Sequence, residues 1–268
     1  MSATRSNPRK LSPSRNNHVL RDSPKTADFD PRNMQTPLKV WCRSDLGAVL
    51  NGSDVSKWLD MSGNGSDFAQ TTAADQPAFQ QSGQGGRPEI SWDDHRMVGG
   101  DFYAMMTDKG EWTIVGVFGK GWSDFQSNSA FQNSPNALTA NPSVGQMGFG
   151  PMNSDGFGGG IYNAGYSDSV AAAGTIGAVG DPVVAMLFSD SGGIKSRQNG
   201  AAGSTAAARD LTSIATTLRL GDIADNGRAD EFYDGPMSEL MIFDGTLQSY
   251  EMTQIEQYVS DRYNFRTQ

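Results

Sequence analysis

Residues 55–65 of the chain are VSKWLDMSGNG, and this stretch is more informative about the fold than any other. It predicts a strand that carries Trp58 and then a turn at Gly63–Gly65, since Gly and Asn tolerate the positive φ angles of turns. Further along, residues 85–93 are GGRPEISWD, which indicates a second strand opened by Pro88. A tryptophan-bearing strand, a glycine-rich turn and another strand are typical of an antiparallel β protein.

A further predicted strand, followed by a helix, lies near the end of the sequence. Residues 234–244 are DGPMSELMIFD, a predicted strand, and a helix is expected over 249–262. Its apolar positions are spaced as on one buried helix face, and they are Met252, Ile255, Tyr258, Val259 and Tyr263. Ser249 is the candidate N-cap. We expect this helix to pack across one edge of a sandwich.

These stretches together resemble the concanavalin A-like lectin/glucanase (laminin-G-like) jelly roll of phage virion and bacterial surface proteins. The resemblance spans residues 38–265 and is carried by its two ends. It implies an all-β fold, a jelly-roll β-sandwich with one short C-terminal helix and an extended N-terminal arm. We expect an arm over residues 1–36 and a sandwich domain over residues 37–268 that ends in the helix at about 249–263.

Further strands are predicted at 38–43, 112–118, 181–188, 193–198, 216–221 and 235–243, with short strands and long loops over 120–165. Turns are expected at 191–192 and 199–200. The single cysteine, Cys42, follows Trp41 in a predicted strand and is expected to be a small buried side chain. No apolar stretch approaches the roughly 20 residues of a membrane span, and no secretory signal is evident.

Charge divides the chain into two parts. Residues 1–36 hold seven basic and three acidic residues, a net charge of +4, whereas the whole chain carries −9, so the remainder carries −13. The arm has too few apolar residues to fold alone, and we expect it to become ordered either on a partner subunit or on the body of its own chain. The basic residues expected to bind that partner are Arg5, Arg9, Lys10, Arg15, Arg21, Lys25 and Arg32. Nucleic acid is not the expected partner, because the acidic body repels a polyanion.

Catalytic patterns are weak. Glycan hydrolysis needs two carboxylates facing one cleft, and alternate positions of a strand would supply them. Glu89 and Asp93 come nearest but are four residues apart. His95 has no nucleophile motif around it and is expected to lie in a loop. We therefore expect no catalytic residues and no enzymatic activity.

Binding residues are easier to nominate. Trp92, Tyr103, Trp122 and Tyr162 are candidate platforms on which a sugar ring stacks. No cofactor is expected, and calcium stays open as the one candidate metal. Its candidate ligands are Asp222, Asp225 and Asp230, which resemble a calcium loop although their spacing fails the helix-loop-helix pattern.

Three function classes stay open on these grounds. The first is a non-enzymatic virion protein, a phage capsid decoration or cement protein made in the host cytoplasm and anchored by its arm. Its partners would be a major capsid protein and copies of itself. The second is a carbohydrate-binding adhesin or receptor-binding tail module that recognises surface glycans. The third is a glycan hydrolase.

Overall fold

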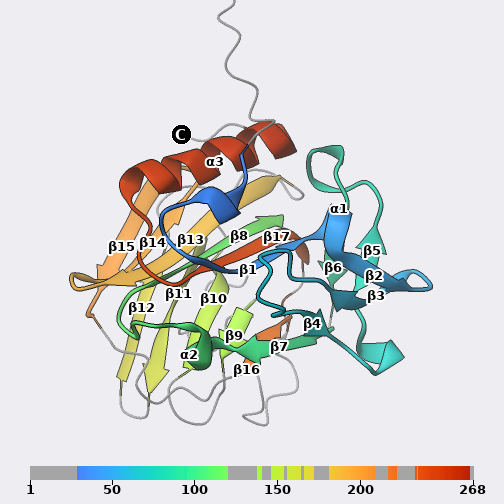
Figure 1. Ribbon diagram of the computed structural model, residues 1–268, viewed down its shortest axis with the longest axis horizontal. Coiled ribbons are helices and arrows are strands. Elements are labelled where there is room, and N and C mark those ends of the chain that lie inside the picture. The colour runs from blue at the N-terminus through green and yellow to red at the C-terminus, as the bar shows by residue number, and fades with distance from the viewer. Residues whose placement is uncertain are drawn as a thin grey trace, which may run out of the picture.

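The structure is a computed structural model, and it describes residues 29–93, 95–119, 138–140, 146–153, 156–163, 166–171, 181–208, 217–221, 233 and 235–265. The described chain forms two antiparallel β-sheets that pack face to face, with a long helix on the outside (Figure 1). The predicted all-β sandwich with a C-terminal helix is confirmed. Residues 1–28 of the expected arm lie outside the described residues.

The first sheet has the strand order β1-β17-β8-β13-β14-β15. Its strands are β1 (Leu38–Arg43), β8 (Trp112–Gly119), β13 (Pro182–Asp190), β14 (Gly193–Gln198), β15 (Ala201–Ala206) and β17 (Gly235–Phe243). Strands far apart in sequence are neighbours here, because β1 pairs with β17 across about two hundred residues. The predicted strands at 38–43, 112–118, 193–198 and 235–243 are all present in this sheet.

The second sheet has the order β4-β7-β16-β9-β10-β11-β12. Its strands are β4 (Phe68–Ala69), β7 (Met97–Asp101), β9 (Leu138–Ala140), β10 (Gln146–Asn153), β11 (Gly156–Asn163), β12 (Tyr166–Ala171) and β16 (Thr217–Leu220). At eight residues each, β10 and β11 are longer than the short strands expected in this region.

Four short strands connect the two sheets at one side of the molecule (Figure 1). They are β2 (Ala48–Asn51), β3 (Asp54–Trp58), β5 (Ala78–Gln80) and β6 (Glu89–Trp92). β6 pairs with the first residues of β17, and β3 pairs with β4 of the second sheet. The described chain also has five short helices: α1 (Ser44–Gly47), α2 (Phe102–Met105), η2 (Pro31–Asn33), η3 (Ala73–Asp75) and η4 (Gln84–Gly86).

The core lies between the sheets, and alternate residues of β8 show how it is built. Trp112, Ile114 and Phe118 face the second sheet, where Phe118 stacks on Phe157 with ring centroids 4.5 Å apart. Val115 and Val117 face the other way, toward the helix. Every residue of β8 is buried, as the β-branched and aromatic sequence of this central strand predicts.

Helix α3 (Ser249–Tyr263) covers the outer face of the first sheet. Its predicted apolar face is confirmed, since Met252, Ile255, Tyr258, Val259 and Tyr263 are all buried. Two expectations were wrong. The helix packs on the face of β1, β8, β13 and β17 rather than across an edge, because these strands present a second apolar surface outward. The N-cap is Gln248 rather than Ser249, because the Gln248 backbone N–H donates to the Glu251 carboxylate at 2.9 Å.

The stretch at 55–65 forms a strand and a loop built around Asp60. Trp58 ends β3 with its ring fully buried, as predicted. The Asp60 carboxylate then accepts hydrogen bonds from the Trp41 N–H at 2.9 Å, the Ser62 N–H and hydroxyl at 2.8 Å and the Ser66 N–H at 3.0 Å. Gly63 and Gly65 have positive φ, which confirms the predicted turn. The motif therefore fastens the loop to β1.

Candidate functional site

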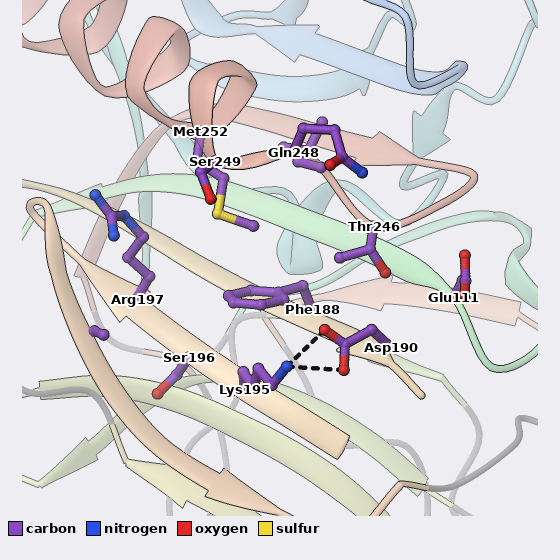
Figure 2. A pocket seen from close by; sticks show the side chains of 12 residues that line it. Glu111, Phe188, Asp190, Lys195, Ser196, Arg197, Thr246, Gln248, Ser249 and Met252 are labelled. Atoms are coloured by element: carbon purple, nitrogen blue, oxygen red, sulfur yellow. Dashed lines mark hydrogen bonds and ion pairs between the residues drawn. The ribbon is translucent and has the colours of Figure 1, made fainter. Parts of the chain in front are cut away.

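A cleft of about 440 Å³ opens on the outer face of the first sheet, beside the start of α3 (Figure 2). Its floor comes from β13 and β14, and its wall comes from the segment that leads from β17 into α3. Helix α3 covers most of this sheet face, but it begins only at Ser249, so the end of the β13–β14 hairpin stays uncovered. The cleft is therefore a product of where the helix starts.

An aromatic ring lies in the middle of the cleft. Phe188 is half-buried and packs against the apolar cluster beneath α3. Thr246, Gln248 and Ser249 line the side that leads into the helix, and Gln248 and Ser249 are exposed (Figure 2). A partly exposed aromatic ring bordered by hydroxyl and amide groups offers both an apolar contact and hydrogen bonds to one ligand.

The β13–β14 turn supplies an ion pair at the mouth of the cleft. Nζ of Lys195 lies 2.8 Å and 2.6 Å from the two carboxylate oxygens of Asp190, and the Gly192 N–H donates to the same carboxylate at 2.7 Å. Desolvation raises the pKa of Asp190, but these bonds outweigh it, so its pKa lies below the usual range. Asp190 is thus held as a carboxylate.

A second ion pair lies at the other end of the cleft. The Arg197 guanidinium binds the Glu256 carboxylate through two bonds of 2.6 Å and 2.9 Å, which joins β14 to α3. Bonding to Glu256 raises the pKa of Arg197, although burial opposes this. Such a bidentate pair fixes the plane of the guanidinium. Both cations on the cleft floor are therefore matched by a carboxylate of the same chain.

Of the nominated stacking residues, Trp92 and Tyr103 are described with their side chains, and neither lines this cleft. Trp92 ends β6 with its ring fully buried in the core, so it presents no face to a sugar, and its nomination was wrong. Tyr103 in α2 is half-buried, with Nζ of Lys109 4.0 Å from its ring centroid. Trp122 and the side chain of Tyr162 lie outside the described residues.

Of the arm residues, Arg32 is described. Its guanidinium bonds to Asp30 at 2.6–3.0 Å and lies over the Trp41 ring, 5.5 Å from the centroid. Arg5, Arg9, Lys10, Arg15, Arg21 and Lys25 lie outside the described residues, as do Asp222, Asp225 and Asp230. No group of His, Cys, Asp and Glu side chains that would hold a metal ion is found in the described part of the chain.

The end of the arm lies on the body. Phe29 stacks on Tyr258 of α3 with ring centroids 4.8 Å apart. The N–H and hydroxyl of Thr36 donate to the Glu251 carboxylate at 3.0 Å and 2.7 Å. The segment between Phe29 and Thr36 is thereby fixed to the surface of α3 at two points, Tyr258 and Glu251.

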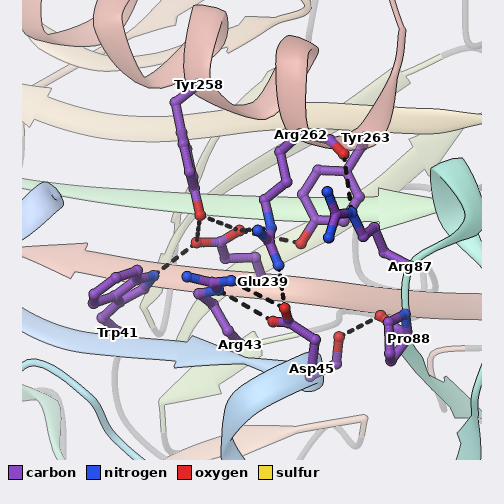
Figure 3. A network of polar contacts seen from close by, with 10 residues as sticks. Trp41, Arg43, Asp45, Arg87, Pro88, Glu239, Tyr258, Arg262 and Tyr263 are labelled. Carbon is purple, nitrogen blue, oxygen red and sulfur yellow. Dashed lines mark hydrogen bonds and ion pairs between the residues drawn. The ribbon is translucent and has the colours of Figure 1, made fainter. Parts of the chain in front are cut away.

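A buried carboxylate forms the centre of a polar network beneath α3 (Figure 3). Glu239 of β17 is fully buried and accepts hydrogen bonds from Trp41 Nε1 at 2.7 Å, the Tyr258 hydroxyl at 3.0 Å and the Tyr263 hydroxyl at 3.1 Å. Nε of Arg262 lies 3.8 Å away. Desolvation raises the pKa of Glu239 despite these donors. Because the group is sealed from solvent, its role is to hold α3 on the sheet.

Other candidates agree with their structural expectations. Cys42 is fully buried, and desolvation raises the pKa of its thiol. His95 lies in a loop, where Nδ1 accepts the Asp93 N–H at 3.2 Å. Glu89 accepts the Gln84 N–H at 2.8 Å, and desolvation raises its pKa.

Sequence reasoning missed the cleft residues Phe188, Asp190, Lys195 and Arg197. One signal was available. Phe188 and Asp190 alternate along β13, and Lys195 and Arg197 alternate along β14, so a hairpin closed at 191–192 brings all four to one face. The register pairs Phe188 with Lys195, which confirms that hairpin and its turn.

Comparison with known proteins supports the fold. No protein-family model matches the chain, and no curated protein matches its sequence. Domain 4 of AbnA, a GH43 extracellular arabinanase from Geobacillus stearothermophilus solved with arabinotriose, is similar with a TM-score of 0.54 and 14% identity; the match covers 84% of this chain and 99% of that domain. At 14% sequence identity this similarity establishes a shared fold and says nothing about shared chemistry.

Two other similar structures are larger proteins. A Trypanosoma rangeli sialidase in complex with sialic acid matches with a TM-score of 0.54 and 12% identity, over 84% of this chain and 33% of the sialidase chain. The binding domain of botulinum neurotoxin serotype C1 matches with a TM-score of 0.53 and 12% identity, over 85% of this chain and 52% of that chain. This chain therefore spans about a third of the length of the sialidase chain and about half of the length of the neurotoxin binding-domain chain.

Proposed function

We propose that the protein is a non-enzymatic binding module that holds a neutral glycan in the Phe188 cleft. The observation that carries the proposal is the half-buried Phe188 ring at the centre of a cleft lined by Thr246, Gln248 and Ser249. The apolar face of a sugar ring stacks on an aromatic ring while hydroxyl and amide groups bind its hydroxyls. The similar domain of AbnA was solved with arabinotriose, a neutral sugar, which is consistent with a neutral glycan as the ligand class.

The charges of the cleft favour a neutral ligand over an anionic one. Lys195 is neutralised by Asp190 and Arg197 by Glu256, at distances of 2.6–2.9 Å. Glu111 adds a further carboxylate to the cleft lining. An acidic ligand would have to displace one of these partners, whereas neutral hydroxyls can bond to the ion pairs as they stand.

The same carboxylates favour binding over hydrolysis. A glycosidase needs one carboxylic acid that stays protonated near neutral pH, which requires a raised pKa. The pKa of Asp190 is lowered instead. Absence of activity is accordingly part of the proposal, together with the absence of a cofactor.

The larger role that we propose is the one that the sequence favours, a phage capsid decoration protein that leaves the host cytoplasm as part of the virion. The contacts of Phe29 and Thr36 with α3 are compatible with this role, because they fix on the helix surface the segment that follows residues 1–28. An arm fixed at this end transmits any load from a capsid partner directly to the sandwich. Its test is particle loading: a chain without residues 1–28 should fold but fail to join particles, and full loading would overturn the anchoring role.

The glycan proposal is tested on a glycan array with the Phe188→Ala variant. Loss of the aromatic contact should weaken binding by about tenfold or more, since aromatic contacts contribute about 0.5–1.5 kcal/mol beyond the area that they bury. Phe79→Ala is the matched control, because Phe79 is also half-buried but lies in β5. Equal glycan binding by wild type and Phe188→Ala, or binding lost equally in both variants, would overturn the site. Release of shortened oligosaccharides would overturn the non-enzymatic assignment.

A further inference from the structure

One carboxylate joins the end of the arm to the wall of the cleft. Glu251 lies in the first turn of α3 and is fully buried. Its Oε1 accepts the backbone N–H of Thr36 at 3.0 Å, and its Oε2 accepts the Thr36 hydroxyl at 2.7 Å. The same Oε2 accepts the backbone N–H of Gln248 at 2.9 Å, and Gln248 lines the cleft. The arm and the cleft therefore share one hydrogen-bond acceptor.

The donors from the arm keep Glu251 in this place. Desolvation raises the pKa of a buried carboxyl, but the donors around Glu251 outweigh it and hold its pKa below the usual value. These donors are the backbone N–H groups of Gln248, Thr36 and Gln35 and the hydroxyl of Thr36. A buried carboxylate that loses such partners turns toward water, because a charge without partners is costly inside a protein. Glu251 therefore stays against the helix end only while Thr36 is seated on it.

The bonds between Glu251 and Gln248 also fix the amide group of Gln248. The side chain of Gln248 accepts the backbone N–H of Glu251, which completes a capping box. A side-chain amide accepts through its oxygen and donates through its nitrogen. The helix thus occupies the oxygen, and the nitrogen is the part of the amide that a ligand can use. Since Gln248 is exposed beside Thr246, the wall of the cleft presents an oriented donor (Figure 2).

We propose that Gln248 is a specificity-determining donor of the cleft and that Thr36 of the arm positions it through Glu251. This inference rests on the proposed glycan site and adds the ligand chemistry at its wall. The amide nitrogen of Gln248 donates to an acceptor oxygen of the sugar, whether hydroxyl, ring or glycosidic. A donor that is already oriented binds more tightly than one that the ligand must order, because ordering a side chain costs affinity. Whatever fixes or displaces Thr36 therefore changes how strongly the cleft binds.

The link must act in both directions. If seating of Thr36 on Glu251 raises the affinity of the cleft, a bound ligand stabilises the seated arm by the same factor. The backbone N–H of Thr36 donates to Glu251, so its exchange with solvent reports this state. Saturating neutral oligosaccharide should slow the exchange of this amide.

Two variants of Thr36 test the positioning role. The probe is the neutral oligosaccharide that gives the strongest signal on a glycan array, and calorimetric titration gives its affinity. Thr36→Val removes the hydroxyl donor and should lower the affinity about two- to tenfold. Thr36→Ser keeps the hydroxyl and should bind like wild type.

Phe29→Ala is the matched control for a general loosening of the arm. Phe29 belongs to the same segment as Thr36, but it stacks on Tyr258, about two turns further along α3 than Glu251. Its loss should leave the affinity of the cleft unchanged. An affinity that Thr36→Val does not change, or that Phe29→Ala lowers as much, would overturn the positioning role.

Gln248→Ser separates the donor from the helix cap. Serine is a good N-cap, so the first turn of α3 should stay protected from hydrogen exchange while the affinity falls by about tenfold. An affinity equal to that of wild type would overturn the donor role. Phe188→Ala keeps this inference distinct from the glycan site itself. Binding that is lost in Phe188→Ala but unchanged in Thr36→Val and Gln248→Ser would overturn only this inference, whereas a wild type that binds no neutral glycan would overturn both.

Discussion

The carboxylate of Glu239 accepts a hydrogen bond of 2.7 Å from the indole Nε1 of Trp41, a residue 198 positions earlier in the chain. Trp41 lies in β1 and Glu239 in the neighbouring strand β17, and both face the underside of α3. Tyr258 and Tyr263 complete the set of donors from the helix. One buried carboxylate therefore holds three elements together.

Replacing Glu239 with Ala should destabilise the fold strongly. The change leaves two tyrosine hydroxyls and an indole N–H without their buried acceptor, and it removes the carboxylate that lies 3.8 Å from Nε of Arg262. Removing one partner of a buried charged group costs about 3–5 kcal/mol of unfolding free energy. Urea denaturation measures it. The exposed carboxylate of Glu111 provides the control, because Glu111→Ala should change stability by about 0.5 kcal/mol or less.

Glu239 should also make stability fall as pH rises. Its pKa is raised in the folded state above the ordinary value of 4.5, so the folded protein binds more protons than the unfolded chain above that pH. The contribution of Glu239 is therefore most favourable below about pH 4.5 and declines as pH increases through the folded pKa. The slope reaches at most about 1.4 kcal/mol per pH unit. Unfolding of wild type and Glu239→Gln between pH 4.5 and 8 tests this, and a stability difference that stays constant over that range would contradict it.

The loop at Asp60 should depend on its carboxylate. Asp60→Ala removes the acceptor for the backbone of Trp41, Ser62 and Ser66. Hydrogen bonds to a charged group contribute about 1.5–3 kcal/mol each when a partner is lost, and water can reach part of this loop, so we expect a net loss of about 2–3 kcal/mol. Asp54→Ala in the adjacent strand is the control, because its carboxylate bonds only locally with Ser53. Similar melting temperatures for the two variants would show that the loop is held by other contacts.

The boundary between arm and body should lie before residue 29 rather than after residue 36. Deleting residues 1–36 removes the Phe29 contact with Tyr258 and the two Thr36 bonds to Glu251, and the body should lose about 2–3 kcal/mol. Deleting residues 1–28 keeps all three contacts. Denaturation of both truncations, with hydrogen exchange of α3 as a local readout, compares them. Equal stability would place the boundary where the sequence suggests, at 36.

Local sequence patterns predicted the strands and the helix because each carries its own periodicity. β8 is rich in β-branched and aromatic residues, and α3 repeats its apolar residues at helical spacing. Ile90 and Trp92 are two residues apart in β6 and so share one face of the strand, but the sequence alone does not show whether that face is buried. Pairing of β6 with β17 directs that face into the core, and a nominated sugar platform becomes a packing residue.

The cleft was harder to predict because it depends on distant segments. Phe188 and Lys195 are neighbours in a hairpin whose turn could be predicted from the sequence. Arg197, in contrast, pairs with Glu256, which lies 59 residues further along the chain. The cleft also depends on the part of β13 that α3 leaves uncovered. The sequence predicted the start of α3 at residue 249, but the ion pair between β14 and α3 has no local signature. The N-cap differs from the expected residue for a related reason, since Glu251 binds both Gln248 and Thr36.

The pairing of β1 with β17 has a consequence for how the protein is made. A ribosome releases β1 early, but its partner strand emerges about two hundred residues later, and the helix that covers both comes last. During synthesis the apolar face of β1 has no native neighbour on that side, and non-local strand pairing of this kind is slow and exposed to aggregation. Closure of the first sheet must therefore wait until β17 has been synthesised, and the yield of folded protein should rise with slower growth or with chaperones that shield nascent strands.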